Sequence, residues 1–457
     1  MNKILKAGLV AGGAVAAASL LRRTMNSEPR YAPWEKPPYE TFRHKVLIVG
    51  GGFAGYTVAQ DLCEKTRGRD DVGVMLISKE NFFTFWPMVP EVVGKDVDVE
   101  NIAQPLRRPL IKSGASFRRA GLEGVDFERK VVTAGGREFE YDHLVIALGA
   151  QPNFFGIPGV EEHSMPMRGL GDALQIRNRV IERYEDATLS PGRTEDSKLN
   201  FVVIGGGATG VETASQLHSL INHALAPDYP SIDPNRVRVY LLEAADDILL
   251  ELDPALRRIA RARLADRHIE VMTNTAAKEV TVDRVILNNG EEIESENVIW
   301  TAGGRPNSTL KNLDLPLTHR DGVIVDEYLR VEDREGVWSL GDCAAIPGEN
   351  GQLVPPTAQA ATQEGTVLAR NILASIDGSD KLEKFRYRPL GQLVELGADF
   401  AVNDIMGVKF SGFLAALFWR ATYVYKLKSP QNRVRIVLDW LLHAFYRPAT
   451  TQIRGLE

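Results

Sequence analysis

Cysteine is scarce in this chain of 457 residues, which contains only Cys63 and Cys343, 280 positions apart. Two such distant cysteines form neither a disulfide scaffold nor a zinc or iron–sulfur ligand run within the chain, and their scarcity fits a reducing compartment. The eight histidines are scattered, and no serine-histidine-aspartate arrangement is visible. An excess of basic charge is also missing, since 54 basic and 60 acidic residues give a net charge of −6. The sequence therefore predicts no metal site and no nucleic-acid partner.

The N-terminus lacks a hydrophobic run of ordinary spanning length. Its uncharged stretch, Ala7 to Leu21, has 15 residues, whereas a membrane-spanning helix needs about 20. Snorkelling of Lys6 would lengthen the apolar stretch, so we expect a short membrane anchor. The Pro-rich residues 24–43 are then predicted to form a linker into the first domain. A cleaved signal peptide is the alternative, because Ala14-Val15-Ala16 resembles a cleavage site.

The C-terminal region has its own charge and composition. Residues 409–457 contain eight basic side chains, two acidic ones and nine aromatics, although aromatics make up only 8% of the whole chain. Phe413 to Tyr425 is almost wholly apolar but too short to span a bilayer, and apolar residues from Val434 to Phe445 recur at helical spacing. We expect residues 391–457 to form a membrane-associating region on a lipid bilayer surface, whose segment after Ser429-Pro430 is an interfacial amphipathic helix. The alternatives are packing on the protein's own core and a homodimer interface.

An internal repeat sets the predicted architecture. KVLIVGGGFAG and NFVVIGGGATG are near copies, with glycines at Gly50, Gly52 and Gly55 and at Gly205, Gly207 and Gly210, an offset of 155 positions. HLVIALG and NVIWTAG, which end at Gly149 and Gly303, are offset by 154 positions. Each glycine motif follows an aliphatic run and precedes a helical pattern, the setting in which such glycines hold a pyrophosphate at a helix N-terminus. The repeat predicts an α/β fold with two Rossmann-like dinucleotide-binding domains.

The residue after the second strand of each unit is expected to meet the adenosine ribose. In the second unit this is Glu243, with no arginine or lysine following until Arg257. A carboxylate accepts from the 2′-hydroxyl and repels a 2′-phosphate, which favours NADH over NADPH. The first unit has Ser78 instead, with Glu80 as a substitute, and so departs from the fingerprint.

These motifs resemble the two-dinucleotide-domain flavoproteins, with FAD on the first glycine motif and NADH on the second. VWSLGDCA, residues 337–344, resembles the late motif in which the Asp342 position holds the flavin ribitol. Four further segments resemble the type II NADH:quinone oxidoreductases: Asn81 to Gly94, GGGATGVE ending in Glu212, PPTAQAATQEG from Pro355 to Gly365, and the C-terminal tail. The resemblance covers about residues 44–447.

The resemblance implies site residues. It places Gln359 and Gln363 beside the flavin at the quinone pocket, and Glu212 near the nicotinamide and the same pocket. A helix starting after Pro356 would also point its positive end at the flavin, which favours the reduced state. The residues expected to hold the cofactors are Gly50, Gly52, Phe53, Ala54, Gly55, Ser78, Lys79, Ala147, Gly149, Gly205, Gly207, Ala208, Thr209, Gly210, Glu243, Gly303, Gly341, Asp342 and Ala358.

The resulting prediction is an FAD-dependent NADH:quinone oxidoreductase that pumps no protons and uses a ubiquinone or menaquinone. Its FAD domain is residues 44–165 and 306–390, its NADH domain is residues 166–305, and the N-terminal residues 1–43 precede them. We expect it on the cytoplasmic side of the cell membrane, peripheral or short-anchored. No cysteine pair is placed to relay electrons, so they leave the flavin directly. The alternatives are a reductase of a soluble acceptor and an NADH-sensing flavoprotein with a partner-binding tail.

Overall fold

The structure is a computed structural model that describes residues 37–189 and 196–452. The predicted N-terminal anchor and most of its linker lie outside the described residues.

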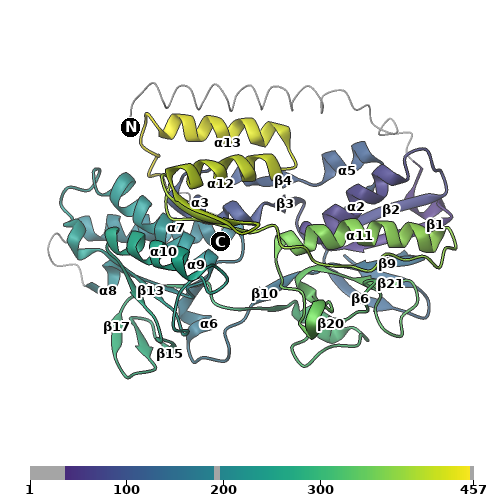
Figure 1. Cartoon of the computed structure of the whole chain (residues 1–457), viewed down its shortest axis with the longest axis horizontal. Coiled ribbons are helices and arrows are strands. Elements are labelled where there is room, and N and C mark those ends of the chain that lie inside the picture. The colour runs from purple at the N-terminus through teal and green to yellow at the C-terminus, as the bar shows by residue number, and fades with distance from the viewer. Residues whose placement is uncertain (1–36, 190–195, 453–457) are drawn as a thin grey trace.

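A five-stranded parallel sheet forms the centre of the first domain, on the right of Figure 1. Its strands, in spatial order, are β21 (Val337–Ser339), β9 (His143–Ile146), β1 (His44–Val49), β2 (Val72–Ser78) and β5 (Ser116–Arg119). Most of their side chains are buried aliphatic residues, as expected for a parallel sheet covered on both faces. Helices α2 (Phe53–Lys65) and α11 (Ala358–Ile376) pack tightly together on this domain.

A second parallel sheet forms the other domain, on the left of Figure 1. Its strands, in order, are β11 (Ser164–Pro166), β18 (Asn297–Trp300), β12 (Asn200–Ile204), β13 (Arg238–Leu242) and β14 (Ile269–Met272). The helices of this domain include α7 (Leu170–Leu189), α9 (Ala208–Ser219) and α10 (Pro254–Asp266). Each domain also carries a three-stranded antiparallel sheet, namely β6 to β8 (Leu122–Asp126, Val131–Ala134, Arg137–Glu140) and β15 to β17 (Ala277–Val280, Arg284–Leu287, Glu292–Glu294).

The sequence repeat occupies matching places in the two sheets. β1 and β12 are the central strands, and each runs directly into a glycine motif and then a helix. β9 and β18, which precede Gly149 and Gly303, pair in parallel with these central strands. The predicted fold of two Rossmann-like domains is therefore confirmed.

The chain passes between the two sheets through one short antiparallel pair, β10 (Ala150–Pro152) with β19 (Gly304–Pro306). It leaves the first sheet after β9 and returns to it for β21, so the second sheet is inserted within the first domain.

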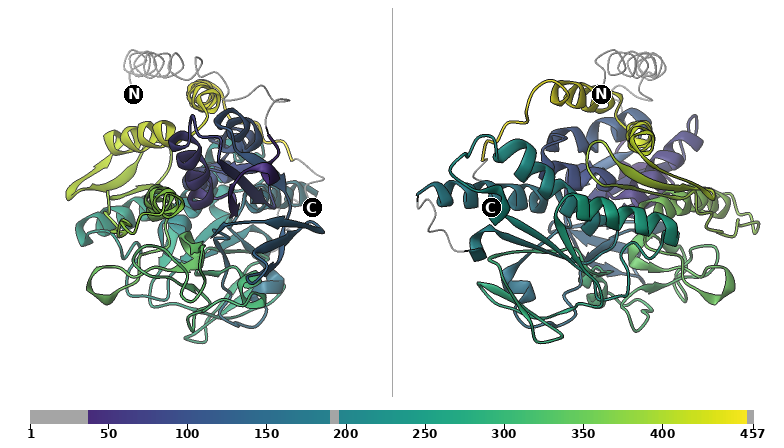
Figure 2. Two further views of the ribbon diagram at one scale, coloured as in Figure 1. Left: turned by 90° about the vertical axis from the view of Figure 1, so that its right-hand side faces the viewer. Right: turned by 60° about the vertical axis from the view of Figure 1, so that its left-hand side comes forward.

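The C-terminal part consists of an antiparallel sheet and two helices. The sheet contains β23 (Gln392–Glu395), β24 (Ala401–Ile405) and β25 (Val408–Gly412), followed by α12 (Phe413–Lys426) and α13 (Pro430–His443). The two helices lie at one edge of the molecule, as Figure 1 and the turned views in Figure 2 show. Within residues 37–189 and 196–452, none of the helices has the length and apolar character needed to cross a bilayer.

Candidate active site

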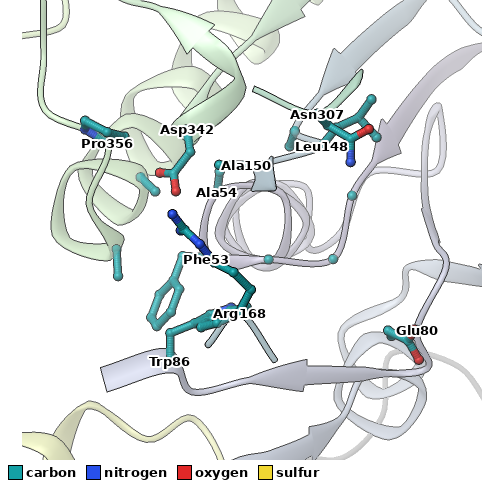
Figure 3. Close-up of a pocket in the computed structure, with 18 of the residues that line it drawn as sticks. Phe53, Ala54, Glu80, Trp86, Leu148, Ala150, Arg168, Asn307, Asp342 and Pro356 are labelled. Carbon is teal, nitrogen blue, oxygen red and sulfur yellow. The ribbon is translucent and has the colours of Figure 1, made fainter. Parts of the chain in front are cut away.

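A cavity of about 700 Å³ lies where the two domains and the C-terminal helices meet. Figure 3 shows part of its wall. The predicted site residues on this wall are Gly50, Gly52, Phe53, Ala54, Ser78, Lys79, Ala147, Gly149, Ala208, Thr209, Glu212, Gly341, Asp342 and Ala358. The cavity therefore brings residues from both nucleotide-binding units to one space.

The first glycine motif is shaped for close approach of a ligand. Gly50 has φ +114°, and a Cβ atom there would lie 2.0 Å from the carbonyl oxygen of Ala147. A Cβ at Gly55 would lie 2.1 Å from the Gly50 oxygen, so this glycine lets the helix pack on the strand. Gly52 faces open space and caps α2 without a side-chain hydrogen bond. The first N–H groups of α2 are thus available to a phosphate beside the cavity.

The second glycine motif repeats this geometry. Gly205 has φ +117°, and a Cβ at Gly210 would lie 1.8 Å from the Gly205 oxygen. Gly207 faces open space and caps α9, again without a side-chain hydrogen bond. Gly205, Gly207 and Gly210 are not on the wall of the cavity, but Ala208 and Thr209, the first residues of α9, are. The second helix N-terminus therefore points its free N–H groups toward the same region.

The two residues predicted to meet a ribose have different surroundings. Glu243 accepts hydrogen bonds from the backbone N–H groups of Gly206, at 2.6 Å, and Ala245, at 2.8 Å. Its carboxylate is therefore held against the second glycine motif. Ser78 is buried at the end of β2, and a Cβ at Gly51 would lie 2.7 Å from its Oγ. In the first unit the small Ser78 side chain thus stands where the second unit has Glu243, and it occupies less of the neighbouring cavity than a glutamate would.

Asp342 is held in the cavity by a short turn. The carboxylate of Glu364, on α11, accepts a hydrogen bond of 2.6 Å from the backbone N–H of Gly341 and so ties the turn to the helix. Burial raises the pKa of Asp342, and the guanidinium of Arg168 opposes that rise. In Figure 3 the Arg168 side chain reaches toward the Asp342 carboxylate. A buried carboxylate facing a cavity is suited to binding hydroxyl groups, such as those of a ribityl chain.

The first unit fits a flavin dinucleotide on these observations. It offers a helix N-terminus for a diphosphate, an open strand end at Ser78, and the Asp342 carboxylate on the opposite part of the wall. The first turn of α11 also borders the cavity through Ala358 and Ala361. Its cap residue Thr357 accepts from Ala360 N–H at 3.1 Å. The positive end of α11 therefore borders the cavity, and its position beside a flavin ring stays a prediction.

Glu212 lies on the cavity wall, on α9, and is 8% exposed. Its Oε1 accepts a hydrogen bond of 3.1 Å from the backbone N–H of Glu395. Burial raises the pKa of Glu212 well above its usual value. Tyr423, on α12, lines the same cavity, and its ring meets the rings of Trp419 and Phe85 edge to face. A buried carboxyl group with a raised pKa thus lies next to a phenol at the junction with the C-terminal region.

Gln359 and Gln363 lie on α11 but are not on the cavity wall. The Oε1 of Gln359 accepts from Tyr387 Oη, at 3.0 Å, and from Leu390 N–H, at 2.7 Å. Gln363 exchanges two hydrogen bonds with the backbone of Arg388, at 2.9 and 3.1 Å. In this structure both amides anchor the segment that leads to β23, and their contact with a quinone stays a prediction.

Other residues predicted to bind the cofactors are not on the cavity wall. Gly55 packs behind the first loop, and Gly303 is covered by the ring of Phe155. Neither Cys63 nor Cys343 forms a disulfide, both side chains are buried, and burial raises the pKa of the Cys343 thiol to about 11. The described cysteines therefore offer no thiol pair beside the cavity.

Several lining residues were not singled out from the sequence. They include Trp86, Arg168, Asn307, Leu393 and Tyr423. Trp86 lies inside the segment NFFTFWPMVPEVVG, which was noted for its resemblance only. Arg168 carried no sequence signal beyond its place at the start of the second domain, because only the fold brings it to Asp342.

Comparison with known proteins places the chain among redox enzymes. The family described as pyridine nucleotide-disulphide oxidoreductase matches residues 44–365, and the NDH2 C-terminal domain matches residues 390–447. A probable NADH dehydrogenase of Dictyostelium discoideum is 31% identical over 87% of this chain and 88% of its own length. The type II NADH:quinone oxidoreductase Ndh of Mycobacterium tuberculosis is 30% identical over 90% of both. The structure of Plasmodium falciparum NDH2 in complex with NADH has a TM-score of 0.83 at 21% identity, covering 90% of this chain and 100% of that chain.

These matches span both Rossmann-like domains and the C-terminal part, and the chain belongs to the type II NADH:quinone oxidoreductases, within the FAD-dependent pyridine nucleotide oxidoreductases.

Proposed function

We propose that this chain oxidises NADH bound at the second glycine motif and reduces a quinone that enters beside α12, with FAD held at the first glycine motif between them. The observation that carries this proposal is the single cavity bordered by both helix N-termini and by Tyr423. FAD, when bound, supplies the chemistry that accepts a hydride from a nicotinamide and passes two electrons to a quinone. The protein supplies orientation and electrostatics.

We assign a separate role to each polar group in or beside the cavity wall. The N-termini of α2 and α9 bind diphosphates, and Asp342 orients the flavin side chain through its hydroxyl groups. Glu243 accepts from the NADH ribose and disfavours a 2′-phosphate. Burial raises the pKa of Glu212 and so favours its protonated form, because the carboxylate form is poorly solvated there. A protonated acid at the cavity edge can donate to a quinone oxygen as that oxygen gains charge.

The outer faces of α12 and α13 support binding to a membrane surface. On α13 two polar side chains are turned inward, while Gln431 and Arg435 are exposed: Asn432 donates to the Asn101 carbonyl at 2.9 Å, and Asp439 accepts from the Asn101 amide. Large apolar side chains are instead exposed, namely Leu414 at 72% and Phe418 at 44% on α12, and Leu438 at 49%, Leu442 at 53% and Phe445 at 63% on or just after α13. A helix of a soluble surface shows the reverse arrangement. The arrangement fits a peripheral helix pair lying in the headgroup region.

The acceptor is a ubiquinone or menaquinone dissolved in the bilayer, and the protein binds the cytoplasmic side of the cell membrane, where NADH is available. A lipid-borne quinone needs a route to the flavin that avoids water. The helix pair provides one, because α12 contributes both outward apolar side chains and the cavity residue Tyr423.

Anaerobic spectroscopy of the purified full-length chain tests the proposal. NADH should bleach the flavin band, and a short-chain ubiquinone analogue should then restore it. A long-chain quinone should restore it only when vesicles are present. Bleaching without restoration by either quinone would favour an NADH-sensing flavoprotein, and a chain without any recoverable flavin would refute the proposed function. Rapid restoration by soluble oxidants, with no response to quinones, would favour a soluble acceptor.

A further inference from the structure

The proposed reaction leaves one proton to be supplied by the protein. A quinone takes up two electrons and two protons, whereas NADH delivers two electrons and one proton as a hydride. The overall reaction is NADH + H⁺ + quinone → NAD⁺ + quinol. One proton per turnover must therefore travel from solvent to a cavity that the C-terminal helices shield. The inference below rests on the proposed function and names the residues that carry this proton.

Two more carboxyl groups are buried behind Glu212. Glu91 lies on α3 (Val89–Gly94) and is 1% exposed, and Glu395 lies at the end of β23 and is 2% exposed. Neither is on the cavity wall, whereas Glu212 is. Structural carboxyl groups are seldom buried so completely without a partner of opposite charge. Three buried carboxyl groups, those of Glu91, Glu212 and Glu395, therefore indicate a functional role at the junction of α3, α9 and β23.

Hydrogen bonds connect this cluster to the cavity on one side and toward solvent on the other. The backbone N–H of Glu395 donates to Glu212 at 3.1 Å. The amide of Gln216 donates to the Glu395 carboxyl group at 3.0 Å and to that of Asp96 at 3.3 Å. Asp96 follows α3 and is only half-buried. Gln216 thus bridges Glu395 to Asp96, the half-buried carboxylate at the solvent side of the cluster, without itself carrying a proton between them.

The charges of the cluster balance when it holds one proton. Glu91 and Glu395 repel one another, and both are attracted to the guanidinium of Arg420, on α12. One cation facing two carboxyl groups leaves a net negative charge unless one of them is protonated. Two further charges face Glu395: Asp96, and Arg267, which is already paired with Asp399 at 3.3 Å. The negative charge of Asp96 and the positive charge of Arg267 act on Glu395 in opposite directions, so one proton on the Glu91–Glu395 pair still gives the smallest net charge.

Unpaired oxygen atoms support the same assignment. Within the part of the chain that the structure describes, the Oε1 atoms of Glu91 and Glu395 are buried without a hydrogen-bond partner. The second oxygen of each has one, since Trp440 Nε1 donates to Glu91 at 3.3 Å and Gln216 donates to Glu395. A buried carboxylate oxygen without a donor is costly, and a proton held by the pair removes that cost.

Tyr423 connects the pair to the cavity. The charges of Glu91, Glu395 and Glu212 all act on its phenol, so the four groups lie close together. Tyr423 also lines the cavity. A hydroxyl group both donates and accepts, and it can therefore pass a proton from one carboxyl group to another.

We propose that the Glu91–Glu395 pair stores the solvent-derived proton of the reaction and delivers it through Tyr423 and Glu212 to the quinone, with Asp96 as the solvent-facing end. In the delivery step the proton of Glu212 moves to a quinone oxygen and leaves a carboxylate. The pair then returns a proton to Glu212, and solvent reprotonates the pair through Asp96. Glu212 is the catalytic residue in this scheme. Glu91 and Glu395 act through it.

The surroundings of the pair fit this storage role. Burial is the main cause that raises the pKa of both Glu91 and Glu395, and Arg420 limits the rise. The pair can therefore hold a proton near neutral pH and still release it. A carboxyl group surrounded only by apolar side chains would keep its proton throughout.

The test compares Glu395→Gln, Glu91→Gln and Tyr423→Phe with a matched control, Glu279→Gln, which removes an exposed carboxylate from β15. The two half-reactions are measured by stopped flow on the flavin-loaded full-length chain, with NADH and then with a short-chain ubiquinone analogue. Bleaching by NADH should match wild type in Glu395→Gln, Glu91→Gln and the control, whose altered side chains do not line the cavity. Reoxidation by the quinone should slow by about tenfold or more in the first three variants, with a larger solvent deuterium effect, and should be unchanged in the control.

Two readouts separate proton supply from a structural role. The wild-type reoxidation rate should fall as pH rises through the neutral range, because the pair empties, and Glu395→Gln should lose this pH dependence. The infrared C=O band of a protonated carboxyl group, present in wild type at neutral pH, should weaken in Glu91→Gln and in Glu395→Gln. If wild type reoxidises normally and the three variants match Glu279→Gln in rate, pH profile and infrared band, the relay is wrong. If wild type itself fails to be reoxidised by quinone, the proposed function is wrong.

Discussion

The assignment of one nucleotide to each glycine motif can be tested with a single added carbon atom. In Gly210→Ala the new Cβ would lie 1.8 Å from the Gly205 oxygen, and in Gly55→Ala it would lie 2.1 Å from the Gly50 oxygen. Both contacts are far below a van der Waals distance and involve backbone, so helix and strand must separate. Overpacking of this kind costs about 1–3 kcal/mol. If the shift falls on the helix N-terminus that binds the diphosphate, affinity drops by about 5- to 140-fold.

The two variants should therefore fail in different ways. Gly210→Ala should keep a full complement of FAD but bind NAD⁺ more weakly and show a higher KM for NADH. Gly55→Ala should purify with less FAD per chain. Gly171→Ala is a matched control, because a Cβ there meets no atom within 4 Å. Flavin content is measured by absorbance after denaturation, and NAD⁺ affinity by calorimetry.

The reverse pattern would refute the assignment. Loss of flavin in Gly210→Ala, with weakened NAD⁺ binding in Gly55→Ala, would exchange the two sites. Variants that behave like Gly171→Ala in both assays would show that the close approach of helix and strand is not what shapes either site.

Three further predictions concern the turn, the glutamines and the helix pair. Burial raises the pKa of Glu364 from 4.5 to about 7, so between these pH values the folded chain binds more protons than the unfolded chain. The free energy of unfolding should therefore fall by up to about 3 kcal/mol as the pH rises from 4.5 to 7. Urea titrations at several pH values should show that Glu364→Gln removes this pH dependence. Gln359→Ala frees the Leu390 N–H from its acceptor and should slow quinone reduction in stopped flow while sparing flavin reduction by NADH; equal loss in both half-reactions would contradict this. The double change Leu438→Ser and Leu442→Ser should weaken flotation with anionic vesicles, because it removes two of the exposed apolar side chains, and should leave reduction of a short-chain quinone intact.

The fold was predictable because its signal is local and doubled. A glycine-rich turn after an aliphatic run is typical of the strand–turn–helix of a dinucleotide-binding unit. Two motif pairs separated by nearly the same number of residues indicate a duplicated unit rather than chance turns. Asp342 was named from the resemblance of residues 337–344 to a flavoprotein motif. The structure places it on the cavity wall just after β21, and its contact with a flavin stays a prediction.

Residues brought to the site by long-range packing were not predicted. Arg168 and Leu393 come from segments without a recognised motif, and Tyr423 comes from the C-terminal tail, whose resemblance assigned it no role. Only the docking of the C-terminal region on α9 brings Leu393 and Tyr423 to the cavity. Gln359 shows the opposite case. Its motif was recognised, but its hydrogen bonds to Tyr387 and Leu390 depend on a segment whose path the sequence did not indicate.

The same helix explains why a quinone could reach the cavity without crossing water. Phe418, which is exposed, and Tyr423, which lines the cavity, are five residues apart on α12. At 1.5 Å per residue they are separated by about 7.5 Å along the helix axis, and a helix is about 10 Å across. In the proposed membrane-bound arrangement, a headgroup at the lipid surface would move only about one helix diameter to meet Tyr423 and Glu212. The apolar outer face, the cavity wall and the buried carboxyl groups lie around one short helix, so the proposed acceptor and its proton would arrive from the same side.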